Sequence, residues 1–151
     1  GEDPMAAVAL ANLAQGDLSR GDPAAALSAY RRSYAQLRRT LELGHPYVTN
    51  AMTGIGRALL AMGGAVDASV VLRHAVALAD RGGAPDELRA EPRFALARAL
   101  AEDDAAPALV LGLARQARAL YAELGPYRAE EVAEIDAQLA RWRRAWARDD
   151  R

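Results

Sequence analysis

The segment that decides the fold runs from residue 44 to residue 80 and reads GHPYVTNAMTGIGRALLAMGGAVDASVVLRHAVALAD. It predicts two helices, Tyr47–Met62 and Ala65–Asp80, joined by a turn at Gly63-Gly64. Proline is favoured in the first turn of a helix and glycine just past its last turn, so Pro46 and Gly63 mark the two ends of the first helix. This unit is a complete helix–turn–helix, and similar units flank it on both sides.

The flanking units are visible as prolines at a nearly constant interval. Pro4, Pro46, Pro85 and Pro126 lie 42, 39 and 41 residues apart. Each interval contains a second break, and these breaks fall at Gly21-Asp22-Pro23, Gly63-Gly64 and Asp103–Pro107. Repeats of this length predict stacked helical units rather than a site built once. The sequence therefore predicts an all-α chain of about seven helices, with repeat 1 at 4–43, repeat 2 at 46–82, repeat 3 at 86–124 and a last helix at 127–148.

Small residues predict how the helices of each pair meet. In the second pair, Gly56 is followed twelve residues later by Ala68 and then by Leu72 and Ala75. A small residue in mid-helix opposite a small residue of the partner lets two antiparallel helices approach closely. Gly54 has no such partner, which predicts close approach of a ligand or of a neighbouring helix. The same spacing occurs in the first pair, at Ala14, Ala26, Tyr30 and Ser33. The third pair keeps Leu96-Ala97 and Ala117. Between them its spacing is shifted by about one residue, at Leu109-Val110.

This pattern of large, small and aromatic residues resembles the tetratricopeptide repeat over about Met5 to Leu124, in a variant with long helices. Gly44-His45-Pro46 followed by GRALLAMG is similar to the units of kinesin light chain, and to arrays attached to serine/threonine kinases and other multidomain signalling proteins of GC-rich bacteria. The resemblance implies an α-solenoid that forms one domain over residues 1–151. We expect this domain to be part of a longer protein.

The last predicted helix carries an apolar stripe made of Val132, Ile135, Leu139, Trp142 and Trp146. We interpret it as a capping helix that covers the open end of the third pair, as a solenoid requires. The alternative is that the two tryptophans, ringed by arginines, bind nucleic acid or a membrane. The capping interpretation is favoured because the tryptophans continue the apolar stripe.

Three local features are also predicted. The first helix should bury a stripe of Leu10, Leu13 and Ala14. The second helix should place Leu27, Tyr30, Tyr34, Leu37 and Leu41 on one apolar face. Pro92 lies six residues after the capping candidate Asp86, so the fifth helix should be kinked or should begin late.

Composition excludes several kinds of chemistry. The 151 residues contain no Cys, so neither a disulfide frame nor a thiolate metal site can form. Lys is also absent, which excludes a Walker A motif, and arginine in its place is typical of a GC-rich bacterial genome. His45 and His74 lie in a predicted turn and on a predicted helix, without a catalytic carboxylate pattern. We predict a protein that is not an enzyme and that uses no cofactor and no metal.

Net charge and hydropathy indicate which classes of partner the protein binds and where in the cell it lies. A formal net charge of −1 gives no general attraction to nucleic acid or to anionic lipid. No apolar run reaches the ~18 residues of a membrane span. The acidic start, Gly1 to Pro4, does not read as a signal peptide, and it suggests an excised fragment. These observations predict a cytoplasmic protein that binds neither nucleic acid nor a membrane.

The resemblance also implies where a partner binds, because the first helix of each pair lines the concave groove of such arrays. Kinesin-light-chain-like units place an Asn before the large-small pair. Asn12 keeps it, whereas Gly54 and Ala95 replace it. The groove positions carried over to this chain are Val8, Asn12, Gln15, Asn50, Thr53, Arg57, Glu91, Phe94, Arg98 and Glu102.

Arg57 and Arg98 occupy equivalent groove positions one repeat apart. Two guanidinium groups on one wall can hold the carboxylates of an acidic peptide. The alternative is that they are solvated or paired with Glu91 and Glu102. The leading prediction is a non-catalytic module that binds a peptide or helix of a protein partner in its groove. The competing prediction is an architectural or regulatory domain that packs on another domain of its own chain or forms a homodimer.

Overall fold

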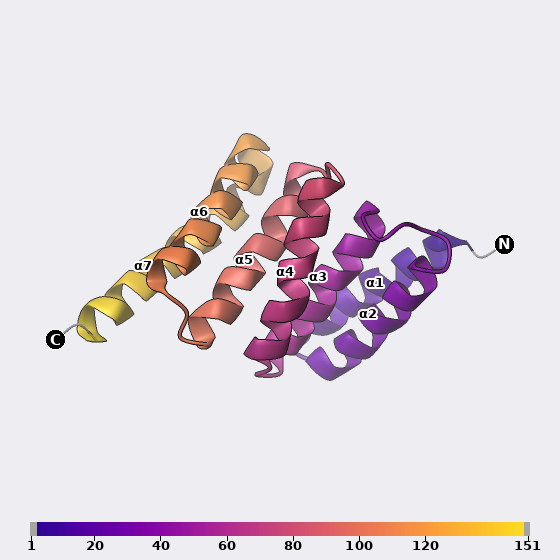
Figure 1. Ribbon diagram of the computed structural model, residues 1–151, viewed down its shortest axis with the longest axis horizontal. Helices are drawn as coiled ribbons and strands as arrows, with labels where there is room; N and C mark the ends of the chain where they lie inside the picture. The colour runs from indigo at the N-terminus through magenta and orange to yellow at the C-terminus, as the bar shows by residue number, and fades with distance from the viewer. Residues whose placement is uncertain (1–2, 150–151) are drawn as a thin grey trace.

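A computed structural model describes residues 3–149 of the chain. These residues form an all-α stack in which consecutive helices lie side by side, from the N-terminus at one end to the C-terminus at the other (Figure 1). This confirms the predicted helical repeat. The elements are α1 (Pro4–Ser19), α2 (Pro23–Leu37), α3 (Pro46–Ala61), α4 (Ala65–Arg81), α5 (Asp86–Glu102), α6 (Pro107–Glu123), a 3₁₀ turn η1 (Pro126–Arg128) and α7 (Ala129–Asp149).

The first three helices, α1, α2 and α3, begin where capping side chains satisfy free backbone amides. The Asp22 carboxylate accepts a hydrogen bond from the Ala25 amide at 3.1 Å, at the start of α2. His45 does the same at α3, where its Nδ1 accepts from the Tyr47 amide at 3.1 Å. A proline follows each cap at the first helical position, as helix starts favour. The turn histidine therefore has a structural role.

The core between paired helices is built around small residues, as predicted. Ala14 and Ala26 are fully buried in the first pair, and Ala68 is fully buried in the second. A Cβ atom added to Gly56 would overlap the side chain of Leu72, so only glycine allows α4 to pack this close. In the third pair the buried partner is Val110, which lies thirteen residues after Ala97 rather than twelve. This one-residue shift matches the irregularity predicted there.

Gly54 is explained by a neighbouring helix and not by a ligand. A Cβ atom at this position would overlap the ring of Tyr30, which projects from α2. The Tyr30 ring is buried, and its hydroxyl donates a hydrogen bond to Oε1 of Gln15 at 3.2 Å. Glycine at position 54 therefore makes room for the tyrosine that joins the first two pairs.

Two of the expected apolar faces differ from the structure. Leu13 is 63 % exposed, and the buried stripe of α1 is Ala7, Ala11 and Ala14. The equivalent residue of the second repeat, Ile55, packs against the core cluster of the first pair, whereas no described helix lies before α1. The second difference is that α2 ends at Leu37, so Leu41 lies beyond the helix although it still packs against the Leu37 cluster.

The expected late start of the fifth helix is wrong. Helix α5 begins at Asp86 and continues through Pro92 to Glu102. Proline lacks an amide hydrogen, so the helix loses only the bond that would reach the Leu88 carbonyl. Pro92 is almost fully buried, and its ring contributes to packing inside the stack.

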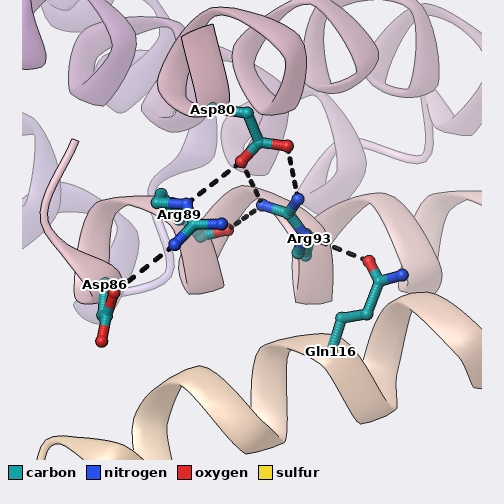
Figure 2. Close-up of polar contacts among 5 residues, drawn as sticks. All are labelled: Asp80, Asp86, Arg89, Arg93 and Gln116. Carbon is teal, nitrogen blue, oxygen red and sulfur yellow. Dashed lines mark hydrogen bonds and ion pairs between the residues drawn. The ribbon is translucent and has the colours of Figure 1, made fainter. Parts of the chain in front are cut away.

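A polar network joins the second pair to the third (Figure 2). Arg93 of α5 donates two hydrogen bonds to the carboxylate of Asp80 on α4, at 2.9 and 2.5 Å. Its Nε donates to Gln116 of α6 at 3.1 Å, and Arg89 also donates to Asp80 at 3.2 Å. The hydrogen bond from Arg93, followed by that from Arg89, holds the pKa of Asp80 below its usual value although partial burial acts against it. Every nitrogen of the Arg93 guanidinium thus has a partner, either from a different helix or from the backbone of α5.

Helix α7 packs on the third pair through the predicted stripe. Ile135 and Leu139 are buried, and Val132, Trp142 and Trp146 pack against the same core cluster. The two indole rings are nearly parallel, with their centroids 6.1 Å apart. The placement of this stripe confirms that the tryptophans belong to the core-facing side of the last helix. Within residues 3–149, every helix is too short or too polar to cross a bilayer.

Candidate functional site on the first-helix face

The helices α1, α3 and α5 form one row along the stack, since α1 contacts α3 and α3 contacts α5. We call this row, continued by α7, the first-helix face. A hollow of about 310 Å³ opens on it. Its lining combines charged side chains with aromatic rings, and consists of Gln15, Arg57, Glu87, Glu91, Phe94, Ala95, Arg98, Tyr121, Arg128, Glu131 and Glu134.

Two further hollows continue from the first, and we call the three together the groove. The second, of about 440 Å³, shares Arg57 and Arg98 with the first and is also lined by Leu18, Ser19, Leu60, Ala61 and Glu102. The third, of about 190 Å³, is lined by Arg98, Ala101, Glu102, Gln138 and Trp142. Arg98 lines all three hollows, so it lies at the centre of the groove.

One wall of the groove is held by Arg57 of α3. Its Nη1 donates to Oε1 of Gln15 on α1 at 2.7 Å and to Oε1 of Glu91 on α5 at 2.8 Å. These two hydrogen bonds join the first helices of all three pairs, and Gln15 also accepts a hydrogen bond from Tyr30 of α2. Burial raises the pKa of the Tyr30 hydroxyl, which therefore stays neutral and acts as a donor.

Arg128, at the end of η1, forms the opposite wall of the groove. It forms ion pairs with Glu87 of α5 and with Glu131 of α7, the latter at 2.9 Å. These hydrogen bonds, first to Glu87 and then to Glu131, raise the pKa of Arg128. Tyr121 of α6 lies beneath this wall, and burial raises its pKa above the usual range. The wall is thus fixed by pairing among its own charges.

Arg98 differs from the other two arginines of the groove. In the described part of the chain it forms no hydrogen bond and no ion pair, whereas Arg57 and Arg128 form both. Its Nε is buried without a partner, as is the Nε of Arg128. The guanidinium carbon lies 5.2 Å from the centroid of the Phe94 ring, a cation–π contact that leaves the N–H groups free. Burial, and then repulsion from Arg57, lower the pKa of Arg98. The groove therefore contains a half-buried cation whose donors are open to an acceptor from outside.

The structure brings together some of the predicted groove residues and separates others. Gln15, Arg57, Glu91, Phe94, Arg98 and Glu102 line the groove. Val8, Asn12 and Asn50 do not line these hollows.

Several of the predicted groove side chains are more buried than a ligand-binding role requires. Thr53 is only 3 % exposed and donates to the Thr49 carbonyl at 2.9 Å, so it is not available to a ligand. Phe94 is also buried and presents little of its ring. Asn50, Arg57 and Arg98, three of the groove positions carried over from the resemblance, are all half-buried.

Sequence reasoning missed the wall formed by Glu87, Arg128 and Glu131. These residues come from separate elements, and the arrangement depends on how η1 turns the chain between α6 and α7. Neither Glu131 nor Glu134 was predicted to line the groove. Their spacing of three residues was the available signal, because it places both on one side of α7.

The fold and the groove define the class of protein as a helical-repeat solenoid with a polar groove on its first-helix face. The family model of the tetratricopeptide repeat matches residues 4–81, just over half of the chain. The chain belongs to the tetratricopeptide repeat family.

Solved structures give the same fold. One of them aligns with 93 % of the present chain, with a TM-score of 0.77 and 22 % sequence identity. It is described as a Podosopora anserina kinesin light chain with nearly identical TPR-like repeats. A form of that protein with one methionine substitution gives the same TM-score and identity. The chain spans 67 % and 66 % of these two structures. A search of curated proteins gives no match.

Proposed function

We propose that this domain is a non-catalytic protein-interaction module that binds an acidic peptide segment in the groove. The observation that carries the proposal is the half-buried, unpaired guanidinium of Arg98 at the centre of three connected hollows. A buried charge without a partner is costly to the free protein, and a carboxylate that pairs with it removes that cost on binding. A carboxylate also matches the planar fork of donors that arginine presents.

The remaining charges of the groove restrict which peptides can bind there. Glu91 and Glu134 act electrostatically on Arg98, and Glu102 lines the two adjacent hollows. A uniformly acidic peptide would be repelled by these carboxylates. The best match is an acidic residue that contacts Arg98, flanked by residues that donate hydrogen bonds or carry positive charge. Arg57 is a weaker second contact because it is already paired with Glu91.

The wider setting follows from the sequence resemblance. We propose a cytoplasmic, multidomain signalling protein of bacterial type, in which this array recruits a protein partner and performs no reaction itself. The absence of Cys and the replacement of Lys by Arg support that setting. The groove supports the recruiting role, since its chemistry is that of recognition by ion pairs and hydrogen bonds.

A peptide selection tests the function. Random peptides displayed on phage are selected on the immobilised domain, and the affinities of the selected peptides are measured by fluorescence anisotropy with wild type and with Arg98→Met. The substitution keeps the side-chain length and removes the charge. Loss of one charge-assisted bidentate contact should weaken binding by about 10- to 100-fold.

The matched control is Arg118→Met, which removes an arginine on α6 that pairs with Asp136 outside the groove. It should bind the selected peptides as wild type does. Selection of peptides without Asp or Glu, or equal affinities for wild type and Arg98→Met, would contradict the proposed binding mode.

A further inference from the structure

The buried polar atoms that lack a partner gather in one part of the molecule. Within residues 3–149, three buried side-chain atoms have no hydrogen-bond partner, and these are Nε of Arg98, Nε of Arg128 and Oε2 of Glu131. All three belong to side chains that line the first hollow of the groove. Buried polar groups are nearly always paired in folded proteins, so the side chains of this hollow leave an unusual amount of hydrogen bonding unmade.

Tyr121 of α6, beneath the same hollow, adds a further unused group. Its side chain is only 8 % exposed, and in the described part of the chain its hydroxyl forms no hydrogen bond. Tyr30, by contrast, is buried and donates to Gln15. The charges that act on the Tyr121 hydroxyl are those of Glu91, Glu131, Arg128 and Arg57, and all four residues line the first hollow. The hydroxyl is therefore directed toward the hollow.

Carboxylates outnumber guanidinium groups in the first hollow, because four glutamates and three arginines line it. Most of these charges are paired, and the pairs are Arg57 with Glu91 and Arg128 with Glu87 and Glu131. In the described part of the chain Arg98 and the exposed Glu134 have no ion pair. A ligand that complements the hollow must therefore bring a negative group for Arg98 and also a positive group for the carboxylates.

We propose that the first hollow binds the ammonium group of a lysine that lies close to the acidic residue held by Arg98. The inference rests on the peptide binding proposed above and names the second side chain of its ligand. The ammonium is accepted by the Tyr121 hydroxyl and by the carboxylates of Glu91 and Glu134. We call these three acceptors the lysine subsite. Glu91 is available because only its Oε1 is used by Arg57, and its side chain is 32 % exposed.

The surroundings favour an ammonium over other cations. The three acceptors come from α5, α6 and α7, and the three N–H groups of an ammonium also point in different directions. A guanidinium is planar, and it binds best to a coplanar carboxylate or on a free aromatic face. The Phe94 ring already carries the guanidinium of Arg98. Among the described residues, no group of three or more acidic or histidine side chains is placed to hold a metal ion.

The lysine subsite lies close to the place of the acidic residue, because the charge of Glu91 acts both on Arg98 and on Tyr121. In an extended peptide, side chains two positions apart are on the same side and about 7 Å apart. An acidic residue and a lysine separated by one residue can therefore contact Arg98 and the lysine subsite at the same time. Burial keeps the Tyr121 hydroxyl neutral by raising its pKa, so its oxygen can accept from the ammonium.

A double-mutant cycle between peptide and domain tests the lysine subsite. Lys is placed two positions before or after the acidic residue of a selected peptide, and a second peptide carries Met in its place. Fluorescence anisotropy should show that wild type binds the better Lys peptide about 3- to 10-fold more tightly than the Met peptide. Tyr121→Phe and Glu134→Gln should each reduce this preference to about twofold or less. Tyr121→Phe removes an oxygen that has no partner in the described part of the chain, so the fold should be retained.

The chain offers a matched control for each variant. Tyr34→Phe removes the hydroxyl of a tyrosine that packs against the cluster around Leu37, outside the three hollows. Glu130→Gln removes an exposed carboxylate of α7 one turn before Glu134. Both controls should prefer the Lys peptide as strongly as wild type does.

Arg98→Met separates a failure of this inference from a failure of the proposed function. If Arg98→Met weakens binding but wild type binds the Lys and Met peptides equally, the acidic contact stands and the lysine subsite is overturned. A preference for Lys that persists in Tyr121→Phe and in Glu134→Gln also overturns it. A peptide with Arg in place of Lys that binds equally well contradicts the ammonium. If Arg98→Met binds as wild type does, the proposed function fails, and the lysine subsite fails with it.

Discussion

Two arginines on α5 show opposite uses of the same side chain. Arg93 is only 10 % exposed, and its donors are occupied by Asp80, Gln116 and the Arg89 carbonyl. Arg98 lies five residues further along the helix, and in the described part of the chain it has no hydrogen-bond or ion-pair partner. Arg93 faces α4 and α6, which supply acceptors, whereas Arg98 faces the groove between α3 and α7.

The comparison shows that this repeat array uses different arginines for stability and for ligand recognition. A buried charge with a complete set of partners fixes the position of neighbouring helices, and removing one partner leaves the others unsatisfied. A half-buried charge without partners costs the free protein some stability, and its donors remain available to a ligand. The account therefore predicts that the two arginines respond in opposite ways to the same substitution.

The largest effect on stability is expected from Arg93→Met. The change leaves the carboxylate of Asp80 and the amide of Gln116 without their main donor. Because Asp80 retains Arg89 and some solvent, the free energy of unfolding should fall by about 2–3 kcal/mol, less than for a fully buried pair. Urea denaturation measures this fall. Peptide affinity under native conditions should stay within about twofold of wild type, and a larger loss would show that the two regions are coupled.

A smaller decrease in the free energy of unfolding is expected when the pH is lowered. The hydrogen bond from Arg93 lowers the pKa of Asp80 in the folded state. The stabilisation is therefore complete above the unfolded-state pKa of about 3.9, and it is lost as the pH falls through the folded-state value. Because 37 % of this side chain is exposed, solvent screens the ion pair, and the loss should not exceed about 1 kcal/mol. Unfolding measured from pH 7 downward should show a shallower acid dependence for Asp80→Asn than for wild type.

Arg98→Met should change stability in the opposite direction. Replacing a half-buried unpaired charge with an apolar side chain of similar length removes a desolvation cost, so the protein should be as stable as wild type or up to about 1 kcal/mol more stable. Binding of the selected acidic peptides should fall as described above. Destabilisation by more than about 1 kcal/mol would mean that Arg98 is structural, as Arg93 is.

The smallest effect is expected from Arg118→Met. Arg118 and Asp136 form two hydrogen bonds between α6 and α7, but both side chains are largely exposed. Exposed ion pairs contribute little, because solvent screens the charges and the side chains lose freedom. The melting temperature should be indistinguishable from that of wild type. A clear decrease would show that this pair holds α7 on the stack.

Much of the fold was predictable from local patterns. The proline intervals predicted the helix pairs, and the Gly56–Ala68 spacing predicted their packing, since both depend on residues close in sequence. The alternatives at Gly54 could not be separated, because the explanation is the Tyr30 ring from another repeat. The predicted burial of Leu13 was wrong because helical periodicity locates an apolar residue on a face but does not show whether another helix covers that face.

The groove was less predictable than the fold. The repeat made Arg57 and Arg98 equivalent, yet Arg57 pairs with Glu91 and Gln15 whereas Arg98 remains open. The difference depends on which acceptors neighbouring helices bring within reach. Arg128 was not recognised at all, because its two partners lie on α5 and α7, and only the turn at η1 brings them together.

The most direct test of the account is a map of backbone amide chemical shifts while a selected acidic peptide is added to the isotope-labelled domain. The account predicts that the shifts concentrate on α1, α3, α5 and the start of α7, with the Arg98 Nε–H resonance among the most affected. It also predicts that the Arg93 Nε–H resonance changes little. Shifts concentrated on α2, α4 and α6, with Arg98 unaffected, would contradict the groove as the binding site.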